Sequence, residues 1–190
     1  MLVALPELPE TSPRAHAIAP VPATAHGLLR TAGDEALCVL FAGHQVAEDG
    51  STLVTDPAVM AERIARLQEA LGPLGAEAQA LADGSFVIAV RERSSSLAIA
   101  GALRCAGQAA AILPTVPLVL ISEDTQAPAI GAVIDRGTQV VSDAAIDAAV
   151  QAGPIAAGRA ALFVDEPTAK ALYGKRDVHR DGAVPYILLP

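Results

Sequence analysis

The stretch from Glu77 to Val90, EAQALADGSFVIAV, places an Asp-Gly turn between two apolar runs. Glycine accepts the positive φ that tight hairpin turns require, so Asp-Gly in this position is a strong signal for two antiparallel strands. We therefore predict a β-hairpin whose turn is formed by residues 82–85. This hairpin limits the chain to folds that contain an antiparallel pair of strands.

A strand and an amphipathic helix are expected before the hairpin. Leu37 to Gly43, LCVLFAG, is a continuous apolar run bounded by turn formers, which is typical of a central strand covered on both faces. Asp56 is a favourable N-cap, Pro57 suits the first helical position, and Gly72-Pro73 predicts the end of this helix. Its apolar residues fall on one face: Met60, Ile64, Leu67 and Leu71.

An Ala-rich helix is predicted after the hairpin, with Ser96 as its cap. Because this helix is apolar almost all round, we expect it to lie flat on the sheet, with close backbone approach at Gly101 and Gly107. Leu118 to Ser122, LVLIS, is a second buried strand.

The last third of the chain carries weaker signals. Val133, Ile134 and Val141 can share a helical face, and Ser142 or Asp143 can begin a short helix that reaches Val150. After a strand, Asp165 caps a helix through Tyr173. Val178 to Leu189 indicates a second hairpin through Asp181-Gly182.

The order of these elements predicts the fold class and the domain boundaries. Helices are segregated from a mixed, mainly antiparallel sheet that contains two hairpins, so we expect an α+β fold with helices on one face. Residues 1–35 are expected to be a Pro-rich linker or tail, since five prolines interrupt them without a helical or alternating period: Pro6, Pro9, Pro13, Pro20 and Pro22. Residues 36–190 are expected to form one domain.

Composition and charge exclude several classes of function. The net charge is −8 and no cluster of Lys or Arg occurs, which disfavours nucleic acid or an anionic membrane as a partner. No apolar run reaches the roughly 18 to 20 residues of a membrane span. The N-terminus lacks a basic region before its apolar run, so we expect no secretory signal and a cytoplasmic location. Cys38 and Cys105, each in an apolar segment, are expected to be buried reduced thiols.

Common catalytic and cofactor motifs are absent. The sequence contains no GxxxxGK[ST], GxGxxG after a strand, HExxH or paired CxxC, so P-loop, dinucleotide, zincin and zinc-ribbon sites have no motif support. The four histidines are isolated, and we expect structural or solvated roles for them: His16, His26, His44 and His179.

Five segments follow one another along the chain: LCVLFAG, LADGSFVIAV, ALRCAGQAA, GAVIDRGTQVV and ALFVDEPTAKAL. Their order resembles that of class III adenylate and guanylate cyclase homology domains, of the kind fused to bacterial Ser/Thr kinases and AAA ATPases. The resemblance covers about residues 36–189. It implies a ferredoxin-like core that pairs with a second copy to build composite sites. In active members, one protomer supplies two aspartates for two metal ions, and the other supplies base-selecting residues, an Asn and an Arg.

Residue by residue, the family pattern is incomplete. The first metal aspartate is replaced by Gly43, and the second falls on Asp83, which also has a plain role as a turn residue. A purine-contacting lysine position falls near Gln79. The transition-state Asn and Arg positions hold Asp135 and Gln139.

These departures affect both halves of a shared site. A homodimer would lack a metal ligand from one side and the Asn and Arg from the other, and losing one transition-state donor costs about 10² to 10³ in rate. Asp135 adds negative charge where a triphosphate would bind. Glu48 and Asp49 would be substitute ligands if their loop folds back, whereas Asp165-Glu166 is better explained as a helix start.

Three functions therefore follow from the resemblance. The first is a catalytically degenerate cyclase-homology domain that acts as a regulatory or dimerisation module, either as a homodimer or with a cyclase-like partner. For this function the resemblance allows a kinase or AAA ATPase in the same polypeptide. The second is an active purine nucleotide cyclase that converts ATP or GTP into cyclic nucleotide and pyrophosphate at a non-standard metal site. The third is a nucleotide sensor without turnover. No cofactor is expected for the first, and Mg²⁺ or Mn²⁺ for the second.

Overall fold

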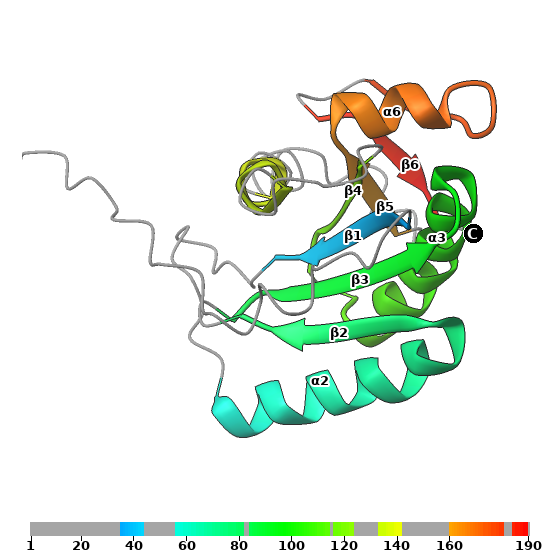
Figure 1. Cartoon of the computed structure of the whole chain (residues 1–190). Helices are drawn as coiled ribbons and strands as arrows, with labels where there is room; N and C mark the ends of the chain where they lie inside the picture. The colour runs from blue at the N-terminus through cyan, green and yellow to red at the C-terminus, as the bar shows by residue number, and fades with distance from the viewer. Residues whose placement is uncertain are drawn as a thin grey trace, which may run out of the picture.

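The computed structural model describes residues 35–43, 56–81, 84–114, 116–123, 133–141, 160–180 and 184–189 (Figure 1). Its elements are β1 (Ala36–Ala42), α2 (Pro57–Leu71), the 3-10 turn η1 (Gly72–Leu74), β2 (Ala76–Ala80), β3 (Phe86–Glu92), α3 (Ser95–Ile112), β4 (Leu118–Glu123), β5 (Ala161–Val164), α6 (Glu166–Leu172) and β6 (Tyr186–Leu188). Residues 133–141 are also helical, and we refer to them as the 133–141 helix.

The described strands form one six-stranded sheet in the order β2-β3-β1-β4-β5-β6. Neighbouring strands are antiparallel except β4 and β5, which are parallel. The first part of the chain runs β1-α2-β2-β3-α3-β4, and its strands lie in the order β2-β3-β1-β4, which is the ferredoxin-like arrangement. The predicted α+β class and ferredoxin-like core are confirmed.

The central position of β1 is also confirmed. Phe41 pairs with Val87 of β3 on one side and with Val119 of β4 on the other. Alternate residues of β1 enter two separate apolar layers, so that Leu40 belongs to one layer and Val39 to the other, both fully buried. Such burial on two faces explains why this strand reads as a continuous apolar run.

The hairpin that opens the sequence argument is present. Strands β2 and β3 are antiparallel, with Ala80 opposite Phe86. The Leu81 amide donates to the Ser85 carbonyl at 2.8 Å, and Gly84 has φ +85, the conformation that favours glycine. Two of the turn residues, Ala82 and Asp83, lie outside the described residues.

Both ends of α2 and the start of α6 agree with the sequence. The Asp56 carboxylate accepts from the Ala58 amide at 2.8 Å, and that of Asp165 accepts from Thr168 at 3.0 Å, so both predicted caps are confirmed. Helix α2 ends at Leu71 with Gly72 as its C-cap, so the predicted end at Gly72-Pro73 is also confirmed. The 3-10 turn η1 follows directly, and the chain turns at Gly75, φ +75.

The cap and one glycine of α3 differ from the prediction. Ser94 is the N-cap, not Ser96, because Ser94 has the extended backbone of a cap and Ser96 is already helical. A Cβ at Gly101 would lie 3.0 Å from Val90 Cγ1, so the predicted close approach is confirmed there. At Gly107 a Cβ would meet nothing within 4 Å, and that prediction is wrong.

The helices do not all lie on one face of the sheet, as the sequence had led us to expect. Helices α2, α3 and α6 share an apolar layer with alternate strand residues such as Leu40, Ile88 and Leu120. The 133–141 helix contributes Val133, Ile134 and Val141 to the opposite layer. Figure 1 shows this helix, drawn in yellow, on the other side of the sheet from α3. The apolar side of the 133–141 helix therefore packs on the sheet face that was expected to carry no helix.

Several remaining predictions have clear outcomes. Cys38 and Cys105 are buried free thiols, as expected. In the described part of the second predicted hairpin, His179 forms an antiparallel bridge with Tyr186 and their ring centroids lie 5.0 Å apart, a structural role for this histidine. The predicted turn residues Asp181 and Gly182 lie outside the described residues. No helix in the described ranges is long and apolar enough to cross a membrane. The predicted helix after Ser142 and the tail in residues 1–34 lie outside the described residues.

Candidate functional site

Gly43, where the resemblance places a metal-binding aspartate, is buried at the end of β1. Its amide donates to the Pro117 carbonyl at 3.0 Å. A Cβ built at Gly43 would lie 2.8 Å from Val141 Cγ1 and 3.1 Å from Pro117 Cγ, closer than ordinary van der Waals contact. This position therefore lacks a carboxylate and has no room for one unless Val141 or Pro117 moves.

The 133–141 helix fills the space above this end of β1. Gly137 lies so close to the ring of Phe41 that a Cβ at Gly137 would overlap three ring carbons. Val133 and Val141 are buried on the same side of the helix. The helix therefore packs directly on the central strand, and a glycine permits close approach at two places. Gly137 of the helix lies against Phe41 of the strand, and Gly43 at the end of the strand lies against Val141 of the helix.

Asp135 and Gln139 are exposed and lie one turn apart on the 133–141 helix. The buried residues of this helix are Val133, Ile134, Gly137 and Val141. Asp135 and Gln139 therefore share the face that points away from the sheet, while Gly43 lies under the buried face. The structure does not bring these two predicted positions together with Gly43.

Gln79 lies on β2 opposite Val87 of β3. Its neighbours Ala78 and Ala80 pack in the layer of α2 and α3, so Gln79 is on the same face of the sheet as the 133–141 helix. Because β3 separates β2 from β1, Gln79 is about 10 Å from β1 across the sheet. Asp83, Glu48 and Asp49 lie outside the described residues.

The described residues do not fit a pair of divalent metal ions. Such ions need several oxygen ligands, chiefly carboxylates. No group of three His, Cys, Asp or Glu that could hold a metal ion occurs within the described ranges. At the end of β1, the position that the resemblance assigns to a ligand is occupied by packed apolar groups of Val141 and Pro117.

A polar cluster beside this region was not anticipated from the sequence. Arg136 Nη2 lies 2.7 Å from Glu123 Oε2 at the end of β4, and its Nε lies 3.5 Å from Asp165 Oδ2. The separation of Arg136 Nε and Asp165 Oδ2 is an ion-pair distance but too long for a good hydrogen bond. Both atoms are buried, and neither has a hydrogen-bond partner within the described structure. Arg136 thereby links the 133–141 helix to β4 and to the start of α6.

The same cluster extends through the first turn of α6. Thr168 Oγ1 accepts from the Ser122 amide at 2.8 Å, while the Thr168 amide donates to the Asp165 carboxylate. The side chain of Asp165 is only 7% exposed, so its charge depends on these partners. The sequence contained one hint, a single arginine in the segment GAVIDRGTQVV, but not the identity of its partners.

Comparisons with known proteins add one structural likeness. No protein-family model matches the sequence, and no curated protein is significantly similar to it. Among solved structures, the chain is similar to the crystal structure of the guanylyl cyclase Cya2, with a TM-score of 0.49 and 11% identity over 84% of this chain and 94% of that chain. The ferredoxin-like core of this chain follows from its own strand order, independently of that likeness.

Proposed function

We propose that this chain is a non-catalytic regulatory domain with cyclase-like topology, which acts by binding a partner protein domain. The observation that carries the proposal is the packing around Gly43. A nucleotide cyclase of the kind the sequence resembles needs a carboxylate there to hold metal ions, and the position is instead filled by Val141 and Pro117.

The 133–141 helix supports the same conclusion. Asp135, exposed on this helix, is negative where the resembling family has a neutral amide, and it would repel a nucleotide triphosphate. Arg136, its neighbour, is engaged by Glu123 and Asp165, so its charge serves the fold. A fold can keep its scaffold and its partner after its chemistry is lost, because packing and chemistry depend on different residues.

Homodimerisation through the sheet has less support than binding to another domain. An apolar sheet face without covering helices would favour pairing with a second copy. Three residues at the centre of that face, Val39, Val87 and Val119, are 1% exposed or less within the single chain. A second copy is therefore not needed to remove these side chains from water.

Turnover assays test the proposal. The full chain is incubated with ATP or GTP and Mn²⁺, and cyclic product is measured by chromatography beside an active cyclase as a positive control. We expect no product above the no-enzyme background. Cyclic nucleotide that forms at a constant rate and is abolished by Asp83→Ala would overturn the proposal in favour of an active cyclase.

The nucleotide-sensor alternative is separated by thermal shift. A ligand that binds only the folded state raises the unfolding temperature in proportion to the logarithm of its concentration. We expect no shift with ATP, GTP or their cyclic products at millimolar concentration. A shift that saturates for one nucleotide would favour a sensor and contradict a purely protein-binding role.

A further inference from the structure

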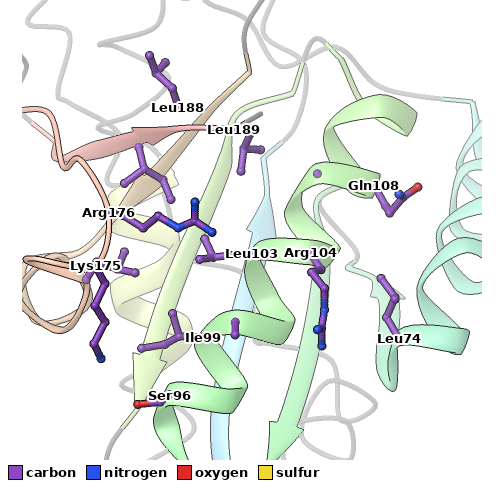
Figure 2. Close-up of a pocket in the computed structure, with 14 residues that line it drawn as sticks. Leu74, Ser96, Ile99, Leu103, Arg104, Gln108, Lys175, Arg176, Leu188 and Leu189 are labelled. Carbon is purple, nitrogen blue, oxygen red and sulfur yellow. The ribbon is translucent and has the colours of Figure 1, made fainter.

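A groove of about 870 Å³ crosses the outer surface of α3, on the side of the sheet opposite to the 133–141 helix. Figure 2 shows α3 in the middle of the groove, with the chain after α6 and strand β6 on one side and Leu74 on the other. Its apolar lining includes residues of α3, α6, β6 and the residue after β6: Ile99, Leu103, Leu172, Ile187 and Leu189. Clefts of several hundred Å³ with such linings are typical of binding sites.

The polar lining of the groove is basic. Arg104, Lys175 and Arg176 belong to it, and its described residues include no Asp or Glu. These three are the charged residues among the described lining residues, in a chain whose 13 basic residues are outnumbered by 21 acidic ones. None of the three forms an ion pair with another described residue. Figure 2 shows the Arg176 side chain reaching from the loop after α6 toward Leu103 on α3.

The floor of the groove has the length and smoothness that suit a helix. From Ser96 to Gln108 the lining follows α3 over 13 residues, whose ends lie about 18 Å or three helical turns apart. Ala100 is exposed, and a Cβ at Gly107 would meet nothing within 4 Å. Small residues at these positions allow the backbone or apolar face of a partner helix to approach closely.

Exposed apolar side chains flank the groove. In the described part of the chain, the large hydrophobic residues classed as exposed are Val59, Leu97 and Tyr173. Leu97 is 54% exposed and adjoins Ser96, and Tyr173 is 81% exposed and lies between the lining residues Leu172 and Lys175. An exposed Tyr close in sequence to a groove-lining Arg is typical of protein interfaces, where both residue types are enriched.

We propose that this groove binds an amphipathic helix of a partner protein, whose apolar face lies along α3 and whose flanking Asp or Glu side chains pair with Arg104, Lys175 and Arg176. The inference rests on the proposed function as a protein-binding domain and names the chemistry of the partner. A second copy of this chain does not fit the groove, because symmetric pairing would bring the same cations together.

Fluorescence anisotropy tests the inference with a labelled 18-residue peptide designed as a helix, with Leu and Ala on one face and Glu at the flanking positions. We expect the full chain to bind it at micromolar concentration and more weakly as salt is raised. The same peptide with Gln in place of Glu should bind at least about tenfold more weakly. Absence of binding by the Glu peptide, or equal binding of both peptides, would overturn the inference.

Matched variants locate the binding surface. Arg176→Glu should weaken binding about tenfold or more, whereas Arg66→Glu, the same charge change on the exposed face of α2, should leave it unchanged. At Gly107 a Cβ would meet nothing within 4 Å, so Gly107→Leu should place a large side chain in the groove and block binding, while Gly107→Ala should not. Equal effects of Arg176→Glu and Arg66→Glu would show that only net charge matters and would overturn the assignment.

The last comparison separates this inference from its alternatives. Vesicles that contain anionic phospholipid, tested with the same variants, should not bind the protein. If vesicles bind, Arg176→Glu abolishes that binding and the peptide does not bind, the ligand of the groove is a membrane surface and not a partner helix. Cyclic nucleotide production, assayed on the same preparations, would refute the proposed function without bearing on the peptide result. If the peptide does not bind and no cyclic nucleotide forms, only the assignment of the groove as a helix-binding site is refuted.

Discussion

The backbone of the 133–141 helix contacts the sheet where Gly137 lies against the ring of Phe41, with no space for a Cβ between them. The helix is consequently held close to β1, and Val141 is brought against Gly43 at the end of that strand. Close packing of this kind is sensitive to a single methyl group. The contact that fixes the helix therefore also closes the position where the resembling family holds metal.

Replacing Gly137 by Ala should destabilise the protein. The added methyl would overlap Phe41, and overpacking costs about 1–3 kcal/mol. Gly107→Ala is the matched control, because it makes the same change in a helix where the Cβ meets open space, and it should stabilise by about 0.5–1 kcal/mol. Urea unfolding of both variants measures the difference. If both substitutions stabilise the protein equally, the packing of Gly137 on Phe41 is wrong.

Gly43→Asp should not create a metal site. Its Cβ would press on Val141 and its carboxylate would be buried without a cationic partner, which together cost about 3 kcal/mol or more. Gly43→Ala isolates the steric part of this cost. In the Gly43→Ala/Val141→Ala double variant, urea unfolding should show less destabilisation than the sum of the single variants, since Val141→Ala removes the clashing methyl. Strict additivity would contradict the contact between the two residues.

The ion pairs of Arg136 should contribute to stability. Arg136→Met leaves the carboxylates of Glu123 and Asp165 without their cation, and because Arg136 is partly exposed we expect a loss of about 2 kcal/mol in free energy of unfolding. A double-mutant cycle with Asp165→Asn should give a coupling energy of about 1 kcal/mol. The exposed pair of Arg180 and Glu166 is the control, and Arg180→Met should have a much smaller effect. A coupling energy near zero would contradict the link between the 133–141 helix and α6.

Stability should depend on Cys105 at alkaline pH. Burial raises the pKa of the Cys105 thiol above its ordinary value of 9.0, with nearby Arg104 opposing the rise. Above pH 9.0 the unfolded chain loses this proton while the folded chain keeps it, so stability falls as pH rises toward the folded pKa. Cys105→Ala should lack this component. The difference in unfolding free energy between wild type and variant, measured from pH 7 to 10, should shrink above pH 9.0; a constant difference would contradict the raised pKa.

At acid pH the expected effect has the opposite direction. The hydrogen bond from Arg180 lowers the pKa of the Glu166 carboxyl below its ordinary value of 4.5. The stabilisation this gives is present above pH 4.5 and is lost as pH falls through the lowered pKa. Thermal unfolding of Glu166→Gln should therefore lose its difference from wild type below pH 4.5. A difference that grows on acidification would contradict the assignment.

The parts of the fold that the sequence predicted are those with local signals. The Asp-Gly turn, the Asp56 and Asp165 caps and the apolar run of β1 each depend on residues a few positions apart. Among the consecutive serines 94–96, however, the sequence did not identify the cap, because any of them has the required hydroxyl. The end of α2 was predicted correctly, because Gly72-Pro73 is a local stop signal and Gly72 is the C-cap of this helix.

The features that the sequence did not predict depend on contacts between residues that are distant in the chain. The side of the sheet covered by the 133–141 helix is decided by the fit of Gly137 on Phe41, residues 96 positions apart in the printed sequence. The partners of Arg136 come from β4 and from the start of α6. At the candidate site, the sequence showed that Gly43 lacks a carboxylate, but only the packing of Val141 and Pro117 shows that the space is filled.

The most direct test of the central claim is paramagnetic broadening of backbone amide signals by Mn²⁺, recorded by NMR on the isotope-labelled full chain in the presence of ATP or GTP. We predict that the amides of Gly43 and its neighbours in β1 keep their intensities at Mn²⁺ levels that broaden only scattered exposed acidic residues. Selective, saturable loss of the Gly43 signal would place a metal ion at the end of β1 and contradict the account.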